Sequence, residues 1–129
     1  MSGRTLISSG SPFEKEIGFS RAVRVGSHIV VAGTAPIAAA GGTDSPGDVY
    51  AQMKRCLEIA VKAVVDAGGS AGDVTRTRIM LTDMTRWREA ARAHGEVFRD
   101  VRPAATFVQV SGFIDPSWLV EIEVDAVVA

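Results

Sequence analysis

Three acidic residues near the end of the chain are spaced so that they could act together. Glu121, Glu123 and Asp125 alternate with apolar residues, so in a β-strand their side chains point to the same face of the sheet. Such a row fits the solvated face of an edge strand. It also fits a cleft in which one carboxylate positions water or accepts a proton. The pattern leaves both interpretations open.

Three arginines occur in other segments that alternate like strands. Arg76 and Arg78 share one face of a predicted strand with Val74, and Arg21 belongs to a predicted hairpin. These arginines could form ion pairs with the acidic strand. Alternatively, a guanidinium group could bind the carboxylate of a substrate in a bidentate manner. Arg21 and Arg78 are therefore candidates both for structural ion pairs and for substrate binding.

One histidine, His94, is a weaker candidate for chemistry. It lies on the apolar face of a predicted helix, together with aromatic and aliphatic residues. A lone histidine in such a place more often packs in the core than acts on a substrate. We keep binding of a substrate as the alternative for His94.

The residues that commonly hold metals or cofactors are scarce. His28 and His94 are the only histidines and Cys56 is the only cysteine, which excludes a disulfide and a thiolate metal cluster within the chain. The sequence also lacks a glycine-rich phosphate loop, a zinc-protease motif and a nucleophile elbow. We expect Cys56 to pack as a small apolar residue, and we expect neither a metal nor a cofactor.

The first half of the chain predicts a β-hairpin followed by a loop. Residues 19–25 and 28–32 are largely β-branched or apolar, and Gly26 and Ser27 separate them at the spacing of a hairpin turn. Residues 33–47 contain four glycines and two prolines, which predicts a loop.

Two segments have the periodicity of amphipathic helices. Between about Asp48 and Ala67, apolar residues recur every three or four positions, and Gly68 follows as a helix stop. A second helix is predicted near residues 85–100, after Asp83 as a capping residue and before Pro103.

The remaining apolar segments predict strands over 74–82, 105–111 and 118–128, with an additional short strand at 5–8. The predicted order is ββαβαββ, which is an α+β fold with both helices on one face of the sheet. Because no linker or repeat interrupts the chain, residues 1–129 are expected to form a single domain.

Two helices can cover only one face of such a sheet, yet residues 29–32 are apolar at every position. The other face must therefore be covered by something else. A symmetric homo-oligomer is the commonest solution, and it also creates clefts between subunits.

Composition excludes several classes of partner. Of the 129 residues, 47% are hydrophobic, and the formal net charge is −1, which gives no positive field for binding nucleic acid. The longest weakly polar stretch, residues 29–42, is too short and too broken to span a membrane. The N-terminus has no apolar core of a signal peptide. We therefore expect a cytoplasmic protein that binds neither nucleic acid nor membranes.

Several segments of the chain resemble one family. They are residues 102–110 (RPAATFVQV), 120–123 (VEIE), 18–23 (GFSRAV) and 31–36 (VAGTAP). In combination they resemble the reactive-intermediate deaminase family, also called Rid or YjgF and once described as L-PSP endoribonucleases. The resemblance covers nearly the whole chain. It implies a chorismate-mutase-like α+β fold and a homotrimer with clefts between subunits.

The resemblance also implies an activity, which this sequence supports only in part. Deaminases of the family hydrolyse 2-imino or enamino acids to 2-keto acids and ammonia. An arginine that directly follows Pro-Ala in the C-terminal motif holds the carboxylate of the substrate. Here that position is Ala105, which offers no donor. The resemblance thus points to a branch without the usual arginine.

Other pocket positions of the deaminase branch also differ in this chain. The expected tyrosine, serine, asparagine and cysteine are replaced by Phe19, Ala32, Ala91 and Phe107. Among the pocket residues that can be placed, Glu121 alone is retained. Glu121 is therefore the candidate catalytic residue, and Arg21, Arg78, His94, Phe19, Ala105 and Phe107 are candidates for substrate binding.

Two functions follow as hypotheses. The first is a hydrolase or deaminase-like enzyme for a small imine, enamine or related carbonyl compound, in which Glu121 positions water and Arg21 or Arg78 holds the substrate. The second is a non-catalytic trimer that binds a small molecule and has lost the chemistry. A ribonuclease is disfavoured by the net charge of −1.

Overall fold

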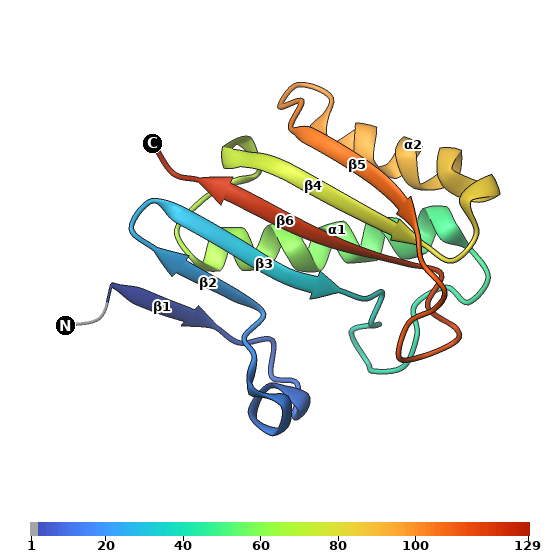
Figure 1. Ribbon diagram of the computed structural model, residues 1–129, viewed down its shortest axis with the longest axis horizontal. Helices are drawn as coiled ribbons and strands as arrows, with labels where there is room; N and C mark the ends of the chain where they lie inside the picture. Colours follow the sequence, from blue (N-terminus) through green and yellow to red (C-terminus); the bar gives the residue numbers. More distant parts are fainter. Residues whose placement is uncertain (1–2) are drawn as a thin grey trace.

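A computed structural model describes residues 3–129 as a six-stranded mixed sheet with two long helices (Figure 1). The strands lie in the order β1-β2-β3-β6-β4-β5, and all neighbours are antiparallel except β4 and β5. The main elements are β1 (Arg4–Ile7), β2 (Ala22–Val25), β3 (His28–Thr34), α1 (Val49–Asp66), β4 (Val74–Leu81), α2 (Trp87–Phe98), β5 (Ala104–Gln109) and β6 (Val120–Val127). The α+β class and the ββαβαββ order are confirmed, with β1 as the additional strand.

The hairpin forms as predicted at its turn but begins later. Gly26 adopts a φ of +60°, and Val25 pairs with His28 across the turn. The prediction that the first strand starts at Phe19 is wrong, because β2 starts at Ala22. Residues 14–18 form one turn of π-helix, and the amide of Phe19 donates to the carbonyl of Glu14 at 2.9 Å. That hydrogen bond removes Phe19 from the ladder.

Helix α1 is held by its cap and by its apolar face. The carboxylate of Asp48 accepts a hydrogen bond from the amide of Ala51 at 2.9 Å, which satisfies one of the free donors at the N-terminus. At the other end, Arg24 of β2 donates to the carbonyl of Ala67 at 2.8 Å. The face that α1 buries consists of Val49, Gln52, Met53, Cys56, Leu57, Ala60, Ala63 and Val64.

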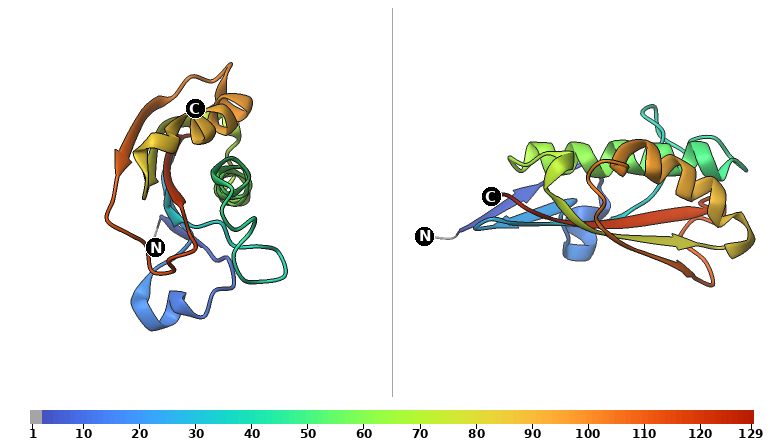
Figure 2. Two further views of the ribbon diagram at one scale, coloured as in Figure 1. Left: turned by 90° about the vertical axis from the view of Figure 1, so that its right-hand side faces the viewer. Right: turned by 90° about the horizontal axis from the view of Figure 1, so that it is seen from above.

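The two faces of the sheet have different environments. In β6, Val120, Ile122 and Val124 are buried under the helices, whereas Glu121 and Glu123 point to the other face. Figure 2 shows both helices on the same side of the sheet, as predicted. The opposite face, called the open face below, carries exposed apolar side chains in this single chain. They are Leu6, Val25, Val30 and Val127.

One residue of β4 lies on a different face from that predicted. Val74 was expected to share a face with Arg76 and Arg78, but it is buried in the core at 4% exposure. The pairing of β4 with β6 shifts by one residue between Val74 and Arg76. This bulge reverses the alternation at that point.

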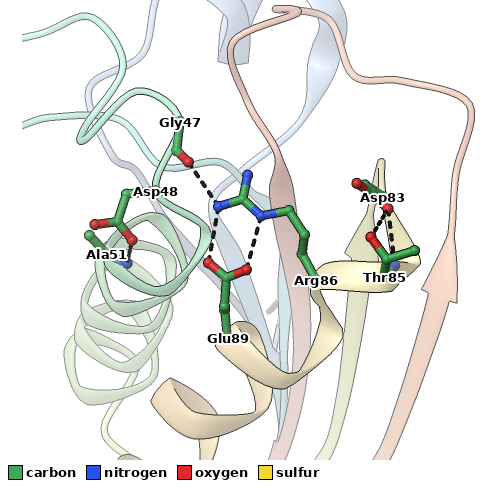
Figure 3. A network of polar contacts seen from close by, with 7 residues as sticks. All are labelled: Gly47, Asp48, Ala51, Asp83, Thr85, Arg86 and Glu89. Atoms are coloured by element: carbon green, nitrogen blue, oxygen red, sulfur yellow. Dashed lines mark hydrogen bonds and ion pairs between the residues drawn. The ribbon is translucent and has the colours of Figure 1, made fainter.

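A polar network joins the start of α2 to the loop before α1 (Figure 3). Arg86 donates two hydrogen bonds to the carboxylate of Glu89, each 3.0 Å long, and one to the carbonyl of Gly47 at 2.9 Å. The predicted capping residue Asp83 accepts from the amide and the hydroxyl of Thr85 and caps the 3-10 turn that leads into α2. The network fixes the N-terminal ends of both helices side by side.

Neither helix in residues 3–129 combines the length and the apolar composition needed to cross a membrane.

Candidate functional site

The predicted site residues fall into three separate places in the chain. Phe19, Arg21 and Glu121 line one pocket. Arg78 lies in β4 and points to the open face of the sheet. His94 lies in α2, which packs on the opposite, helix-covered face of the sheet. The pairing of β5 with β4 places Ala105 and Phe107 next to Thr77 and Ile79, on that same helix-covered face.

The pocket has a volume of about 850 Å³, which is the size of a site for a small molecule. It forms where three parts of the chain meet: the segment between β1 and β2, the end of β3 with its following loop, and one side of α1. Trp118, two residues before β6, and Glu121, near the start of β6, complete the pocket. We call it the Glu121 pocket.

Glu121 has the environment of a group that can exchange a proton. Its side chain is half-buried, and burial raises the pKa of the carboxyl above its usual range, although the charge of Arg21 acts in the opposite direction. The carboxylate accepts no hydrogen bond from residues 3–129 in the structure. Gly33 lies opposite, where a Cβ atom would be 3.1 Å from Oε1 of Glu121. The carboxylate is therefore both close to the backbone of β3 and free of a protein donor among the described residues.

Arg21 is engaged by the protein backbone. Its Nη1 atom donates to the carbonyl of Gly33 at 2.6 Å and to the hydroxyl of Thr34 at 3.0 Å. Burial lowers its pKa, and the charges of Glu14 and Glu121 act in the opposite direction. The guanidinium carbon lies 5.5 Å from the centre of the Phe19 ring. Arginine remains charged at neutral pH in spite of this lowered pKa, and the two donors of Nη1 are already used.

Two buried N–H groups at the Glu121 pocket lack a partner among the described residues. They are Nε of Arg21 and Nε1 of Trp118. Buried donors are normally satisfied by the protein or by ordered water, so these two groups mark the polar end of the pocket.

Arg78 and its neighbour Arg76 form cross-strand ion pairs with the acidic row. Nη1 of Arg78 lies 2.5 Å from Oε1 of Glu123, and Nε of Arg76 lies 3.8 Å from Oδ2 of Asp125. Both pairs are partly exposed. The ion-pair interpretation thus describes these two arginines in the single chain, and a role of Arg78 in substrate binding would require it to leave Glu123.

His94 belongs to an aromatic group at the edge of the sheet. Its Nε2 atom is 2.9 Å from the hydroxyl of Thr77, and its ring lies 6.3 Å from the ring of Phe107. Trp87 meets Phe107 edge to face at 5.9 Å. Burial lowers the pKa of His94, so the imidazole is neutral at neutral pH. Ala105 pairs with Thr77 of the adjoining strand, so the groups near it, Thr77, His94 and Phe107, carry no charge.

The aromatic group and the Glu121 pocket do not face each other within one chain. Arg21 and Glu121 line a pocket with one side of α1, whereas His94 and Phe107 contact each other at α2. Within one chain, therefore, His94 does not line the pocket that Arg21 and Glu121 share.

Some residues of the pocket were not identified from the sequence. Trp118 was predicted only as the first residue of a strand, and Gly33 only as part of a loop and of the family motif at residues 31–36. The apolar residues Phe13 and Ile17, which also line the pocket, lie before the predicted hairpin. The glycine at 33 was the available clue, because a glycine inside a strand often marks a close approach.

Among residues 3–129, no group of three or more histidine, cysteine or acidic side chains is arranged to hold a metal ion. Cys56 is buried on α1, and burial raises the pKa of its thiol. This thiol is consequently protonated and unreactive at neutral pH.

A mixed sheet with both helices on one face, and a pocket of small-molecule size around a half-buried carboxylate, together define a small α+β protein with a metabolite-sized site. The chain belongs to the Endoribonuclease L-PSP family, whose model matches residues 10–128. The resemblance described from the sequence is thus confirmed at the level of the family, which is also called YjgF or Rid.

Individual relatives agree with this assignment. Rv2704 of Mycobacterium tuberculosis, a member of the YjgF/YER057c/UK114 family, is 45% identical with a TM-score of 0.88, over 97% of this chain and 99% of that chain. SCO2049 of Streptomyces coelicolor is 40% identical over 120 residues, which are 93% of this chain and 89% of the relative. Escherichia coli TdcF, solved with bound serine, is 26% identical with a TM-score of 0.78, over 96% of this chain and 94% of that chain.

Proposed function

We propose that this protein hydrolyses a small imine, enamine or related carbonyl compound in a cleft to which the Glu121 pocket contributes. The observation that carries the proposal is Glu121 itself. It is half-buried in a pocket of about 850 Å³, its pKa is raised by burial, and it accepts no hydrogen bond from the described residues. A carboxylate with these properties can take a proton from water.

The proposed reaction needs only water as a second reactant. The imine reacts in its protonated form, as an iminium ion. Glu121 accepts a proton from the water molecule while the water oxygen bonds to the iminium carbon, which gives a neutral carbinolamine. The carboxylic acid then returns this proton to the nitrogen. As the C–N bond breaks and the C=O bond forms, Glu121 accepts the proton of the hydroxyl group and passes it to the departing ammonia, so the products are a carbonyl compound and an ammonium ion.

We further propose that the complete site lies between subunits of a homotrimer, each subunit being a single domain over residues 1–129. The exposed apolar side chains of the open face support assembly, because such patches commonly bury against another copy. A neighbouring subunit would bring Ala105, His94 and Phe107 toward the Glu121 pocket. In the proposed site these residues bind substrate together with Phe19 and Arg21, and Arg78 contributes if it leaves Glu123.

The residues around Ala105 support a substrate without a carboxylate at that position. Ala105 has no donor, and its neighbours on the same face are the neutral imidazole of His94 and the ring of Phe107. Burying a carboxylate against such a wall without a cation is unfavourable. We therefore expect this protein to hydrolyse 2-imino acids such as 2-aminoacrylate slowly. Its rate should be lower than that of arginine-bearing relatives by roughly 30- to 1000-fold.

The proposal is tested with Glu121→Gln, which keeps the shape of the side chain and removes the base. Ammonia release is measured with imines generated in situ, one from a pyridoxal-phosphate dehydratase and one, without a carboxylate, from an amine oxidase. We expect the rate to fall by about 100-fold or more while the assembly stays intact. Asp125→Asn, on the same strand and face but outside the Glu121 pocket, is the matched control and should keep the rate of the unchanged protein. Equal rates for the two variants would refute a catalytic role of Glu121.

A second candidate function is non-catalytic binding of a small molecule. Two observations favour it: Ala105 lacks a donor, and the relative TdcF was solved with bound serine. In that case Glu121→Gln would change ligand affinity without any turnover to lose. Calorimetry with serine and with simple carbonyl compounds, run beside the ammonia assay, separates the two functions.

A further inference from the structure

The end of β3 contains an irregularity directly opposite Glu121. The pairing of β3 with β6 shifts between Val31 and Thr34, so that Gly33 lies in a bulge. The glycine at this place lets the strand approach to 3.1 Å of Glu121 Oε1, measured from its ideal Cβ position. The position of the carboxylate therefore depends on how the bulge is held.

Arg21 is the side chain that holds the bulge. Its Nη1 atom donates to the carbonyl of Gly33 and to the hydroxyl of Thr34, and that hydroxyl in turn donates to the carbonyl of Ala32 at 2.8 Å. One guanidinium nitrogen thus ties together three consecutive residues of the bulge. A carbonyl displaced from the ladder would otherwise need a partner from water.

Arg21 also acts on Glu121 through its charge. The charges that influence the carboxyl are Arg21, which favours ionisation, and Glu123 of the same strand, which opposes it. Arg21 is in turn influenced by Glu14 of the π-helix and by Glu121. Arg78, the other candidate arginine on this side of the sheet, is paired with Glu123.

We propose that Arg21, besides bordering the substrate, is a positioning residue: it clamps the bulge at Gly33 against Glu121 and places a positive charge near this carboxylate. The clamp uses both donors of Nη1, and the charge acts on Glu121 whether or not a ligand is present. The inference rests on the proposed function in that Glu121 is the group that handles water.

Two substitutions separate the clamp from the charge. Arg21→Gln keeps an amide donor and removes the charge, whereas Arg21→Lys keeps the charge on a shorter stem. The titration of the Glu121 carboxyl is followed by NMR of its side-chain carbon, in protein without ligand. We expect Arg21→Gln to move the midpoint upward by roughly half a pH unit or more, and we expect Arg21→Lys to leave it near its original value.

The clamp has its own readout in the same samples. The amide of Thr34 belongs to the peptide group whose carbonyl, that of Gly33, accepts from Arg21. Its resonance should shift, and its hydrogen exchange should quicken, in both variants. If Arg21→Gln does not fold, Arg21→Lys alone decides, because the inference predicts an altered Thr34 amide together with an unchanged Glu121 midpoint.

Arg24→Met provides the matched control. Arg24 lies in the same hairpin and also donates to backbone carbonyls, those of Gly26 and Ala67, but it does not take part in the bulge. It should leave both the Glu121 midpoint and the Thr34 amide unchanged. An unchanged Glu121 midpoint in Arg21→Gln, or an unchanged Thr34 amide in both Arg21 variants, would overturn the inference.

Failure of the proposed function has a different signature. If no imine is hydrolysed by the unchanged protein, the hydrolase proposal fails, yet the titration of Glu121 and the Thr34 amide still report on the role of Arg21. Conversely, hydrolysis that survives Arg21→Gln with an unchanged pH profile would remove Arg21 from the mechanism and leave Glu121 in place.

Discussion

The space between Gly33 and Glu121 is too narrow for a side chain larger than the hydrogen atom of glycine. A methyl group at position 33 would lie 3.1 Å from the carboxylate oxygen, which is tighter than ordinary van der Waals contact. The backbone of Gly33 does not need a positive φ, so an alanine is compatible with the local conformation. The carboxylate, and not the strand, is the part that must move.

We therefore predict that Gly33→Ala keeps the fold but impairs the site. The displaced carboxylate should lower imine hydrolysis by roughly 10-fold, because errors of about 1 Å in the placement of a catalytic group are costly. In the double variant with Glu121→Gln the effect should vanish, since no carboxylate remains to be displaced. Ammonia release from the two single variants and the double variant measures this. Additive losses would show that Gly33 acts independently of Glu121.

His94 makes the stability of the protein sensitive to acid. Its pKa in the folded protein lies below the ordinary value of 6.5 because the ring is half-buried. The unfolded chain therefore binds more protons near this pH, and the free energy of unfolding decreases as the pH falls below about 6.5. Above that pH the imidazole is neutral in both states and has no such effect.

We predict that His94→Gln loses less stability on acidification than the unchanged protein. Glutamine can keep a hydrogen bond to Thr77 and does not titrate. Urea unfolding at pH 7.5 and pH 5.5, at equal protein concentration, gives the two free energies for each protein. His28→Gln, which alters an exposed histidine, controls for the general effect of acid. The same loss in both variants and the unchanged protein would exclude His94 as its source.

At the scale of the elements, an aspartate caps the N-terminal region of each helix, and one polar network joins the two regions. Asp48 caps α1, and Asp83 caps the turn before α2, while Arg86 connects the two regions through Gly47 and Glu89 (Figure 3). The loop that follows β3 lines the Glu121 pocket and ends at this junction. Its anchoring thus bears on the site as well as on the fold.

We predict that Asp48→Ala lowers the free energy of unfolding by about 1 kcal/mol, the usual cost of losing a side-chain cap. Glu58→Ala, an exposed change in the middle of the same helix, should have a smaller effect. Chemical denaturation monitored by circular dichroism distinguishes the two. If the two changes cost the same, the hydrogen bond from Ala51 to Asp48 would not be a stabilising cap.

The elements themselves could be predicted because their signals are local. The 3.6-residue period of α1 and the alternation of β6 follow from which side chains must be buried, and the structure places both segments close to the predicted bounds. A bulge in β4 and a π-helical turn before β2 were not predicted, and they account for two errors. Val74 changed face because the register shifts beside it, and Phe19 left β2 because its amide pairs with Glu14.

Only those site residues whose position follows from the pattern of a single strand could be predicted from the sequence. Glu121 was found from its alternation with apolar neighbours and from the family motif. Trp118 and the side of α1 that lines the pocket were not found, since they come together only when distant segments pack. The separation of Arg21 from His94 was equally invisible, because faces of different elements are related only by the folded sheet.

The whole molecule presents a sheet that is covered on one side alone. The homotrimer remains a prediction, and the open face gives it a direct test. Val30 is 50% exposed there, and it pairs with Asp125 of the neighbouring strand. A charged residue at position 30 would place an ion where the proposed interface is apolar.

We predict that Val30→Arg gives a folded monomer, because the arginine can pair with Asp125 in the same chain while it blocks apolar contact between copies. Sedimentation velocity should show a trimer for the unchanged protein and a monomer for the variant. Val65→Arg, which changes a similarly exposed valine on the outer side of α1, should stay trimeric. A monomeric unchanged protein at micromolar concentration would contradict the trimer itself.

The position of β6 has a consequence for how the chain folds during synthesis. Among the strands of residues 3–129, β6 comes last in the chain, yet it lies between β3 and β4 and joins the β1–β3 group to the β4–β5 pair. Until residues 120–127 leave the ribosome, the β1–β3 group and the β4–β5 pair are not joined in one sheet. Completion of the sheet therefore waits for these residues and requires pairing between distant segments, which makes this step slow.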